Sequence, residues 1–242
     1  MTVCCVRVRR DRGADSGVGL RRARRGAAAC GDPPRTAARI RRRFLAGAAA
    51  RTGVVLLVGQ SGWLREWDRR PPPMMLLLVA ILGLGVLIAR STAGDRLARG
   101  LSLPALVALQ GFRLPLELLM HETAAAGIMP AQMTYSGLNF DIVSGVTAIG
   151  LAAWMTIRTA PRGVVVAWNV LGLVLLANIV TIAVLSTPTF AVFGEEPGRL
   201  NTFVTRPPYV LLPAIMVLAA WAGHLVVFRA LAARPGVSPR RP

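Results

Sequence analysis

The sequence predicts an all-α fold, a polytopic membrane bundle of about six transmembrane helices with both termini in the cytoplasm. The chain of 242 residues is 54% hydrophobic and 17% charged, with a mean hydropathy of +0.52, whereas an average soluble domain is about 25% charged. Its apolar residues gather in continuous runs that show no period-two alternation, which excludes membrane-spanning strands. Arginine gathers between alternate runs, as expected of cytoplasmic loops.

A span of the hydrocarbon core needs roughly 20 apolar residues. The first run is weakened by Arg51, the second is short and follows three prolines, and the third carries several polar residues. The remaining three runs are uninterrupted by arginine. The sequence therefore predicts a transmembrane domain over residues 44–228, with helices at 44–63, 74–89, 101–120, 139–157, 163–186 and 207–228.

The formal charge of +18 comes from 29 arginines against 11 acidic residues, with no lysine. Arginine is dense before residue 44, in 90–99, in 158–162 and in the short basic tail 229–242, but absent from 121–138. The rule that positive loops stay inside places these arginine-rich segments in the cytoplasm. The nearly neutral loops 64–73 and 194–207 are then external.

Residues 1–43 hold 13 arginines and three aspartates and show almost no apolar periodicity, which predicts a disordered tail. We expect a cytoplasmic tail near anionic lipid headgroups, or an extension from a misplaced start codon. Arg41–Arg43 before Phe44 fits a twin-arginine export signal, but flanking charge on the first helix is the favoured interpretation. No aromatic residue precedes Phe44, so we expect no nucleic-acid partner.

The third predicted helix carries Gln110, Arg113, Glu117 and His121 at spacings of three, four and four, so they share one helical face. A charge within the bilayer costs at least about 2.5 kcal/mol, so such residues normally face the bundle interior and have partners. Arg113 and Glu117 can pair along the helix, and Asp141 of the next, antiparallel helix can approach the same level.

Two interpretations of this cluster stay open. It could form a polar cavity that binds or passes a small polar or ionic solute, with Arg113 holding an anionic group, or a salt-bridge lock between helices in a structural or assembly protein. A metal site of Glu117, His121 and Asp141 lacks a denser His/Cys set, so we expect no metal or other cofactor. No catalytic motif is present; a membrane-embedded, metal-dependent enzyme remains the alternative, and the oligomeric state is left open.

The other polar residues of the predicted helices are expected to have structural roles. Asn139 is expected to cap its helix, with Asp141 in the first turn. Asn169 and Asn178 lie about 180° apart on the fifth helix, so each is expected to make an interhelical hydrogen bond. His224 is expected to be interfacial, near the cytoplasmic end of the last helix.

Several segments resemble the core of an uncharacterised group of bacterial multi-pass membrane proteins. The likeness covers about residues 64–228, and the long arginine-rich start departs from it. The resemblance implies this fold and a location in a bacterial cytoplasmic (inner) membrane, but no activity. Its segments are Phe112–Glu117, Pro130–Thr134, Gly137–Asp141, Gly145–Ala148, Trp168–Asn169, Asn178–Val180, Leu185–Ser186 with Pro188, and Leu212–His224.

Overall fold

The structure is a computed structural model that describes residues 33–234, and within this range it contains helices and no strands. The chain divides into two units, residues 1–51 and 52–242, and α2 crosses the boundary between them. The predicted tail therefore lies mostly outside the described residues. The helices are α2 Pro33–Gln60, α3 Pro73–Arg90, α4 Thr92–Gly100, α5 Leu103–Ala108, α6 Arg113–Ala125, α7 Ile142–Ile157, α8 Arg162–Leu185 and α9 Leu218–Ala233.

Four stretches of helix are long and apolar enough to cross a membrane. They are Pro73–Arg90, Leu103–Ala125, Arg162–Leu185 and Leu212–Ala233, while the apolar helices Leu45–Gln60 and Ile142–Ile157 are shorter. The all-helical, membrane-type fold is thus confirmed, and the count of six crossings stays a prediction. One boundary was wrong: α2 begins at Pro33, so the helix takes in the last part of the predicted tail.

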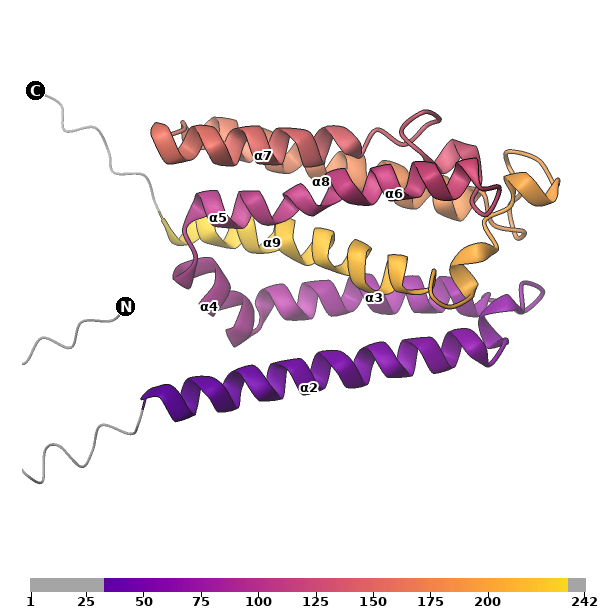
Figure 1. Ribbon diagram of the computed structural model, residues 1–242, viewed down its shortest axis with the longest axis horizontal. Helices are drawn as coiled ribbons and strands as arrows, with labels where there is room; N and C mark the ends of the chain where they lie inside the picture. Colours follow the sequence, from indigo (N-terminus) through magenta and orange to yellow (C-terminus); the bar gives the residue numbers. More distant parts are fainter. Residues whose placement is uncertain (1–32, 235–242) are drawn as a thin grey trace, which may run out of the picture. The chain divides into compact units, whose positions relative to one another are not determined.

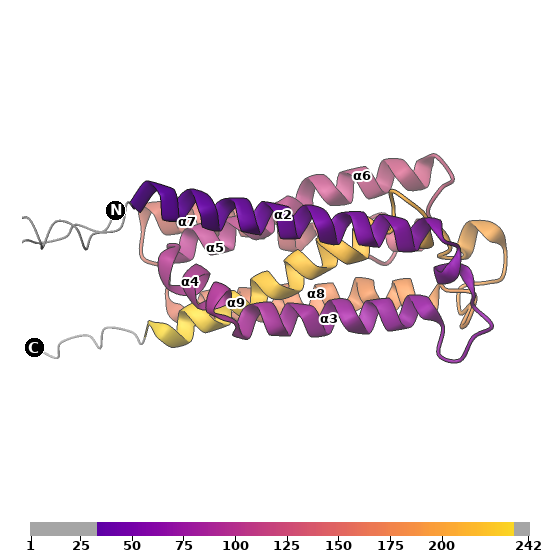
Figure 2. The same cartoon turned by 90° about the horizontal axis from the view of Figure 1, so that it is seen from below.

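Within residues 52–234, α3, α7, α8, α9 and the α5–α6 stretch run alongside one another (Figures 1 and 2). α9 packs against α3, α5 and α8, while α7 packs against α5 and α6. One end of this bundle carries α4, the α7–α8 connection and the end of α9, with seven arginines against one aspartate. The opposite end, with five arginines and five acidic residues, holds the longer loops.

α4 is an element that the sequence analysis left as a loop. The Ser91 hydroxyl accepts a hydrogen bond from the Gly94 N–H at 3.2 Å and caps the helix. On its polar side, Asp95 accepts from Arg99 Nε at 3.0 Å and from Arg229 Nη2 of α9 at 2.9 Å. The hydrogen bond from Arg99, helped by the charge of Arg229, lowers the pKa of Asp95 below its usual value.

The long α5–α6 stretch is not a uniform α-helix. Pro115 has no N–H to donate to the Gly111 carbonyl four residues earlier, and residues Leu109–Phe112 tighten into a short 3-10 segment, η2. α7 approaches closely here, because a Cβ on Gly111 would lie 2.9 Å from the Ile149 side chain. Gly145 of α7 also allows the two helices to approach closely, because a Cβ at this position would lie 3.1 Å from the Arg113 carbonyl carbon.

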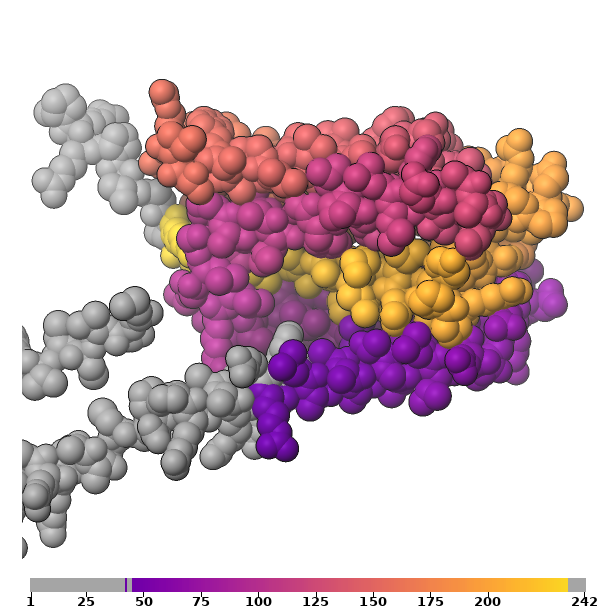
Figure 3. Space-filling view, viewed as in Figure 1, coloured from indigo at the N-terminus to yellow at the C-terminus, as the bar shows by residue number. Residues whose placement is uncertain are grey.

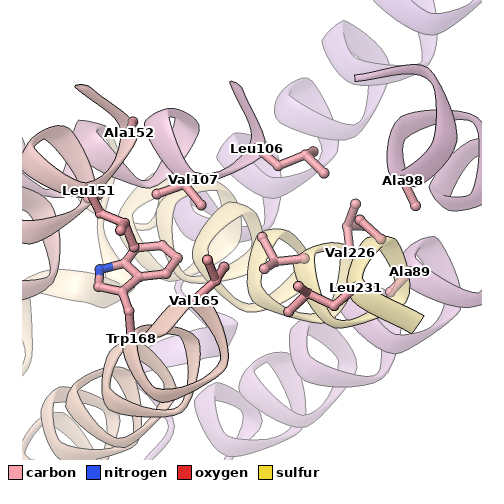
Figure 4. Packing of buried hydrophobic residues seen from close by; sticks show 13 residues of the cluster. Ala89, Ala98, Leu106, Val107, Leu151, Ala152, Val165, Trp168, Val226 and Leu231 are labelled. Carbon is pink, nitrogen blue, oxygen red and sulfur yellow. The ribbon is translucent and has the colours of Figure 1, made fainter. Parts of the chain in front are cut away.

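The buried apolar residues form separate clusters along the bundle. The largest, near the arginine-rich end, is shown in Figure 4 and centres on Val107, Val165, Trp168 and Val227. A second, near the long loops, is rich in methionine and includes Met74, Met120, Met129 and Met133. In the regions of α6, α8 and α9, buried polar residues lie in the sequence between residues of the first apolar cluster and residues of the second. We call these residues the polar layer.

Candidate ligand-binding site

Arg113 is the centre of the polar layer, and its side chain is only 1% exposed. Its Nη1 donates to Ser144 Oγ of α7 at 2.7 Å and to the Gly172 carbonyl oxygen of α8 at 3.2 Å. The same nitrogen lies 3.3 Å from His224 Nε2 of α9. One guanidinium nitrogen thus meets three other helices, a set that we call the Arg113 network.

The ion-pair partner of Arg113 is Asp141. Its Oδ1 lies 3.0 Å from Arg113 Nη1, although the alignment does not make this contact a hydrogen bond. The expected pairing of Arg113 with Glu117 was wrong: among the described residues, Arg113 forms an ion pair with Asp141 alone. Glu117 does not pair with Arg113 because its carboxylate is hydrogen-bonded to another residue.

Both carboxylate oxygens of Glu117 accept from Asn139 Nδ2, at 2.9 and 2.8 Å. Asn139 is fully buried, and its Oδ1 accepts the Asp141 N–H at 3.0 Å. α7 begins at Ile142, so Asn139 does not cap the helix as expected but forms an Asx turn before it. One asparagine therefore binds the Glu117 carboxylate and the backbone of Asp141.

His224 is fully buried, so the expectation of an interfacial histidine was wrong. A guanidinium has no acceptor, so Nε2 must be the unprotonated nitrogen that faces Arg113. Nδ1 then carries the proton and donates to Asn169 Oδ1 at 2.8 Å, while Asn169 Nδ2 donates to the His224 carbonyl oxygen at 3.1 Å. These paired hydrogen bonds join α8 to α9 and fix the histidine tautomer.

A cavity of about 100 Å³ extends from Arg113 towards the loop-rich half of the bundle. Its lining includes the ionisable residues Arg113, Glu117 and Asp141 and the polar residues Thr187 and Asn201. The rest of the lining is apolar and comes from α3, α6, α8, the loops and η6. η6 is a π-helix over Leu212–Val217 that continues into α9. Figure 3 shows α6 and the segment leading into α9 as neighbouring bands on one face.

The edge of the guanidinium opposite the network has no partner. Arg113 Nε and Nη2 are buried and make no hydrogen bond, in a residue that lines the cavity. These two nitrogens carry three N–H groups, and leaving buried donors unpaired costs about 1–3 kcal/mol or more for a charged group. Arg113 therefore keeps three buried N–H donors without a partner in the described part of the protein.

The other predicted residues lie apart from this cavity. Gln110 is buried and donates to the Ala220 carbonyl oxygen of α9 at 3.3 Å. His121 is half-buried, stacks on Tyr135 with 4.7 Å between ring centroids, and lies 3.2 Å from Ser136 Oγ. Asn178 donates to the Leu138 carbonyl oxygen, in a loop rather than a helix. Helical spacing put His121 on the face of Glu117, but the nearby loop provides its contacts.

Sequence reasoning missed Ser144, the Gly172 carbonyl and the methionine-rich lining. Ser144 lies one helical turn after Asp141, and that spacing is a signal that could have added it to the cluster. The Gly172 carbonyl leaves no trace in a sequence. Among the residues that the structure describes, no group of three or more His, Cys, Asp or Glu is placed to hold a metal.

Comparisons of this chain with protein families, with curated proteins and with solved structures find no match.

Proposed function

We propose that this protein is a multi-pass membrane protein that binds a small polar solute in the cavity at Arg113. One observation carries the proposal: three buried ionisable residues, Arg113, Glu117 and Asp141, line one cavity, and Arg113 still has two nitrogens without a partner. A purely structural arginine would use its donors on the protein. The four helical stretches that are long and apolar enough to cross a membrane support the membrane location.

The proposed setting is a bacterial cytoplasmic membrane crossed six times. The two ends of the bundle differ in charge, with arginine concentrated at the end that holds α4. The positive-inside rule then orients that end to the cytoplasm. The cavity lies in the opposite half, so the solute would reach it from the external side or from the outer leaflet.

A matched pair of substitutions on α8 tests solute binding. Ala183 lines the cavity, while Ala177 is exposed on the same helix. We expect Ala183→Leu to fill the space and to abolish a bound small molecule that native mass spectrometry detects on the wild-type chain. Ala177→Leu should retain it. A wild-type chain with no bound molecule, or equal occupancy in both variants, would contradict the proposal.

A structural lock is the second candidate, favoured by the reach of the Arg113 network. Arg113 on α6 contacts α7, α8 and α9 through a single nitrogen. Such a network holds four helices in one arrangement whether or not a solute binds. If the network is only a structural lock, Ala183→Leu should not change which small molecules native mass spectrometry finds bound to the purified protein. This outcome distinguishes the lock from solute binding.

A further inference from the structure

We propose that a groove between α3 and α9, at the arginine-rich end of the bundle, is a binding site for an anionic phospholipid of the surrounding membrane. The groove has a volume of about 470 Å³ and is lined by Val86, Ala89 and Arg90 of α3 and by Leu225 and Arg229 of α9. This inference goes beyond the proposed function, because none of these five residues lines the cavity at Arg113.

The two arginines of the groove lie at the same level of the bundle. Arg90 ends one stretch that is long and apolar enough to cross a membrane, and Arg229 lies in the last turns of another. α3 and α9 pack against each other and both run towards the arginine-rich end (Figures 1 and 2). Arg229 Nη1 donates to the carbonyl oxygens of Ala89 and Ser91, the two neighbours of Arg90, at 2.6 and 2.9 Å. Because arginines near the ends of spanning helices reach the lipid headgroups, the groove lies at the headgroup level.

The groove has more positive charge than nearby carboxylates neutralise. Arg90 is exposed and forms no ion pair with any described residue. Arg229 pairs with Asp95 at 2.9 Å, but Asp95 also pairs with Arg99 at 3.0 Å. Three arginines against one aspartate leave this group with a net charge of +2. A lipid phosphate is an anion that a guanidinium binds through charge-assisted hydrogen bonds.

Apolar side chains lie one helical turn from each arginine, on the side of the membrane interior. Val86 precedes Arg90 by four residues and Leu225 precedes Arg229 by four, and all four residues line the groove. Four residues of an α-helix advance by about 6 Å along its axis and return to the same face. The groove therefore offers arginine at the headgroup level and hydrocarbon below it, which is the order of groups in a phospholipid. A soluble phosphate would leave Val86 and Leu225 uncovered.

The two arginines differ in how firmly the protein holds them. Arg229 is fixed by two carbonyl oxygens and by Asp95, so it joins α9 to α3 and α4. Arg90 is the arginine that can close onto a phosphate, because it is exposed and forms no ion pair. Substitution of Arg90 therefore removes a lipid contact without breaking an ion pair of the protein, whereas substitution of Arg229 would also loosen the helices. Basic pockets between transmembrane helices are a known mode of acidic-lipid recognition.

Three probes test the inference by native mass spectrometry of the full chain in detergent. They are phosphatidylglycerol, which is anionic, phosphatidylcholine with the same acyl chains, which has no net charge, and glycerophosphoglycerol, the anionic headgroup without acyl chains. We expect phosphatidylglycerol to bind more tightly than either of the other two.

A matched pair of arginine substitutions locates the site. We expect Arg90→Gln to weaken the first step of phosphatidylglycerol binding about fivefold, which corresponds to about 1 kcal/mol for one arginine at a lipid surface. Arg158→Gln removes an exposed arginine from the same end of the bundle, at the end of α7 and outside the groove, and should leave that step unchanged. Val86→Phe keeps both arginines but fills the apolar part of the groove, so it should also weaken binding.

Each of the other outcomes would overturn the inference. Equal weakening by Arg90→Gln and Arg158→Gln would mean that lipid is attracted to the whole arginine-rich end and not to the groove. Equal binding of the two lipids would show that the arginines do not select for charge. Glycerophosphoglycerol that binds as tightly as the intact lipid would identify a soluble phosphate ester as the ligand, and unchanged binding in Val86→Phe would show that the acyl chain does not use the groove.

Discussion

At the scale of residues, the unequal use of the Arg113 guanidinium is the main feature of this protein. Nη1 meets Ser144, Gly172, His224 and Asp141, whereas Nε and Nη2 meet nothing. A buried charge normally needs both a counter-ion and full hydrogen bonding. Arg113 has the counter-ion but lacks part of the hydrogen bonding.

Substitution of the ion pair should show which carboxylate neutralises Arg113. Breaking a buried pair by removing one partner costs about 3–5 kcal/mol, while replacing both can be nearly neutral. We expect Arg113→Leu to destabilise the protein and Asp141→Leu to recover much of the loss when added to it. Thermal unfolding of the singles and the double in detergent measures this coupling.

Glu117 provides the control for that measurement, because Asn139 holds its two oxygens. The double variant Arg113→Leu with Glu117→Leu should recover less stability than the double with Asp141. A larger recovery with Glu117 would mean that the ion pair lies along α6 after all.

Gly172 gives a second prediction at this scale. A Cβ there would lie 2.7 Å from His224 Nε2 and 3.0 Å from Ser144 Oγ, so Gly172→Ala displaces two members of the Arg113 network. We expect it to cost about 1–3 kcal/mol, as overpacking of a core does. Gly150 is exposed with nothing within 4 Å of its Cβ position, so Gly150→Ala should be neutral or stabilising by up to about 1 kcal/mol. Thermal unfolding compares them, and equal effects would contradict the close packing.

The candidate site was only partly predictable from these residues. Arg113, Glu117 and Asp141 stand out because charges are rare in apolar runs, and a spacing rule brings them together. The choice of Asp141 over Glu117 as partner depends on Asn139, which lies in a loop that folds back onto α6. His224 was misassigned because position along a helix does not reveal that α9 crosses the middle of the bundle.

At the scale of elements, the helix bounds follow from composition while their irregularities do not. α3 and α8 match the predicted spans within one residue at each end, because long apolar runs leave little freedom. α4 was missed because its nine residues include three charged side chains and two glycines, a composition typical of a loop. The 3-10 segment η2 follows from Pro115, whereas the π-helix η6 has no sequence signal that periodicity detects.

α4 should depend on pH through Asp95. The folded pKa of Asp95 is lowered by its hydrogen bond to Arg99, so the stability it contributes is fully present above the unfolded pKa of about 3.9 and is lost as pH falls through the folded value. We expect Asp95→Asn to speed amide exchange in α4 near neutral pH, with the difference from wild type shrinking in acid. Glu196→Gln, in a loop far along the chain, should leave α4 unaffected. A difference that persists in acid would show that the charge of Asp95 is not the cause.

At the scale of the whole molecule, the asymmetry of arginine predicts the orientation. Ala126 follows α6 at the loop-rich end, and Thr159 lies between α7 and α8 at the arginine-rich end; both are exposed. With the natural cysteines replaced by serine, we expect Ala126→Cys to react with an impermeant thiol reagent from outside intact cells. Thr159→Cys should react only after the cells are opened. Labelling of both from one side would overturn the threading.

The π-helix η6 forms the beginning of one continuous helix, which goes on as α9. Relative to an α-helix, a π turn acts as an inserted residue, and each residue of an α-helix turns the chain by about 100°. Leu212–Val217 forms a wall of the cavity, while His224 lies further on, in regular α-helix. A one-residue deletion within 212–217 would rotate the wall and leave the histidine in register. The shape of the cavity can therefore change by insertion or deletion in this segment without rebuilding the polar layer beneath it.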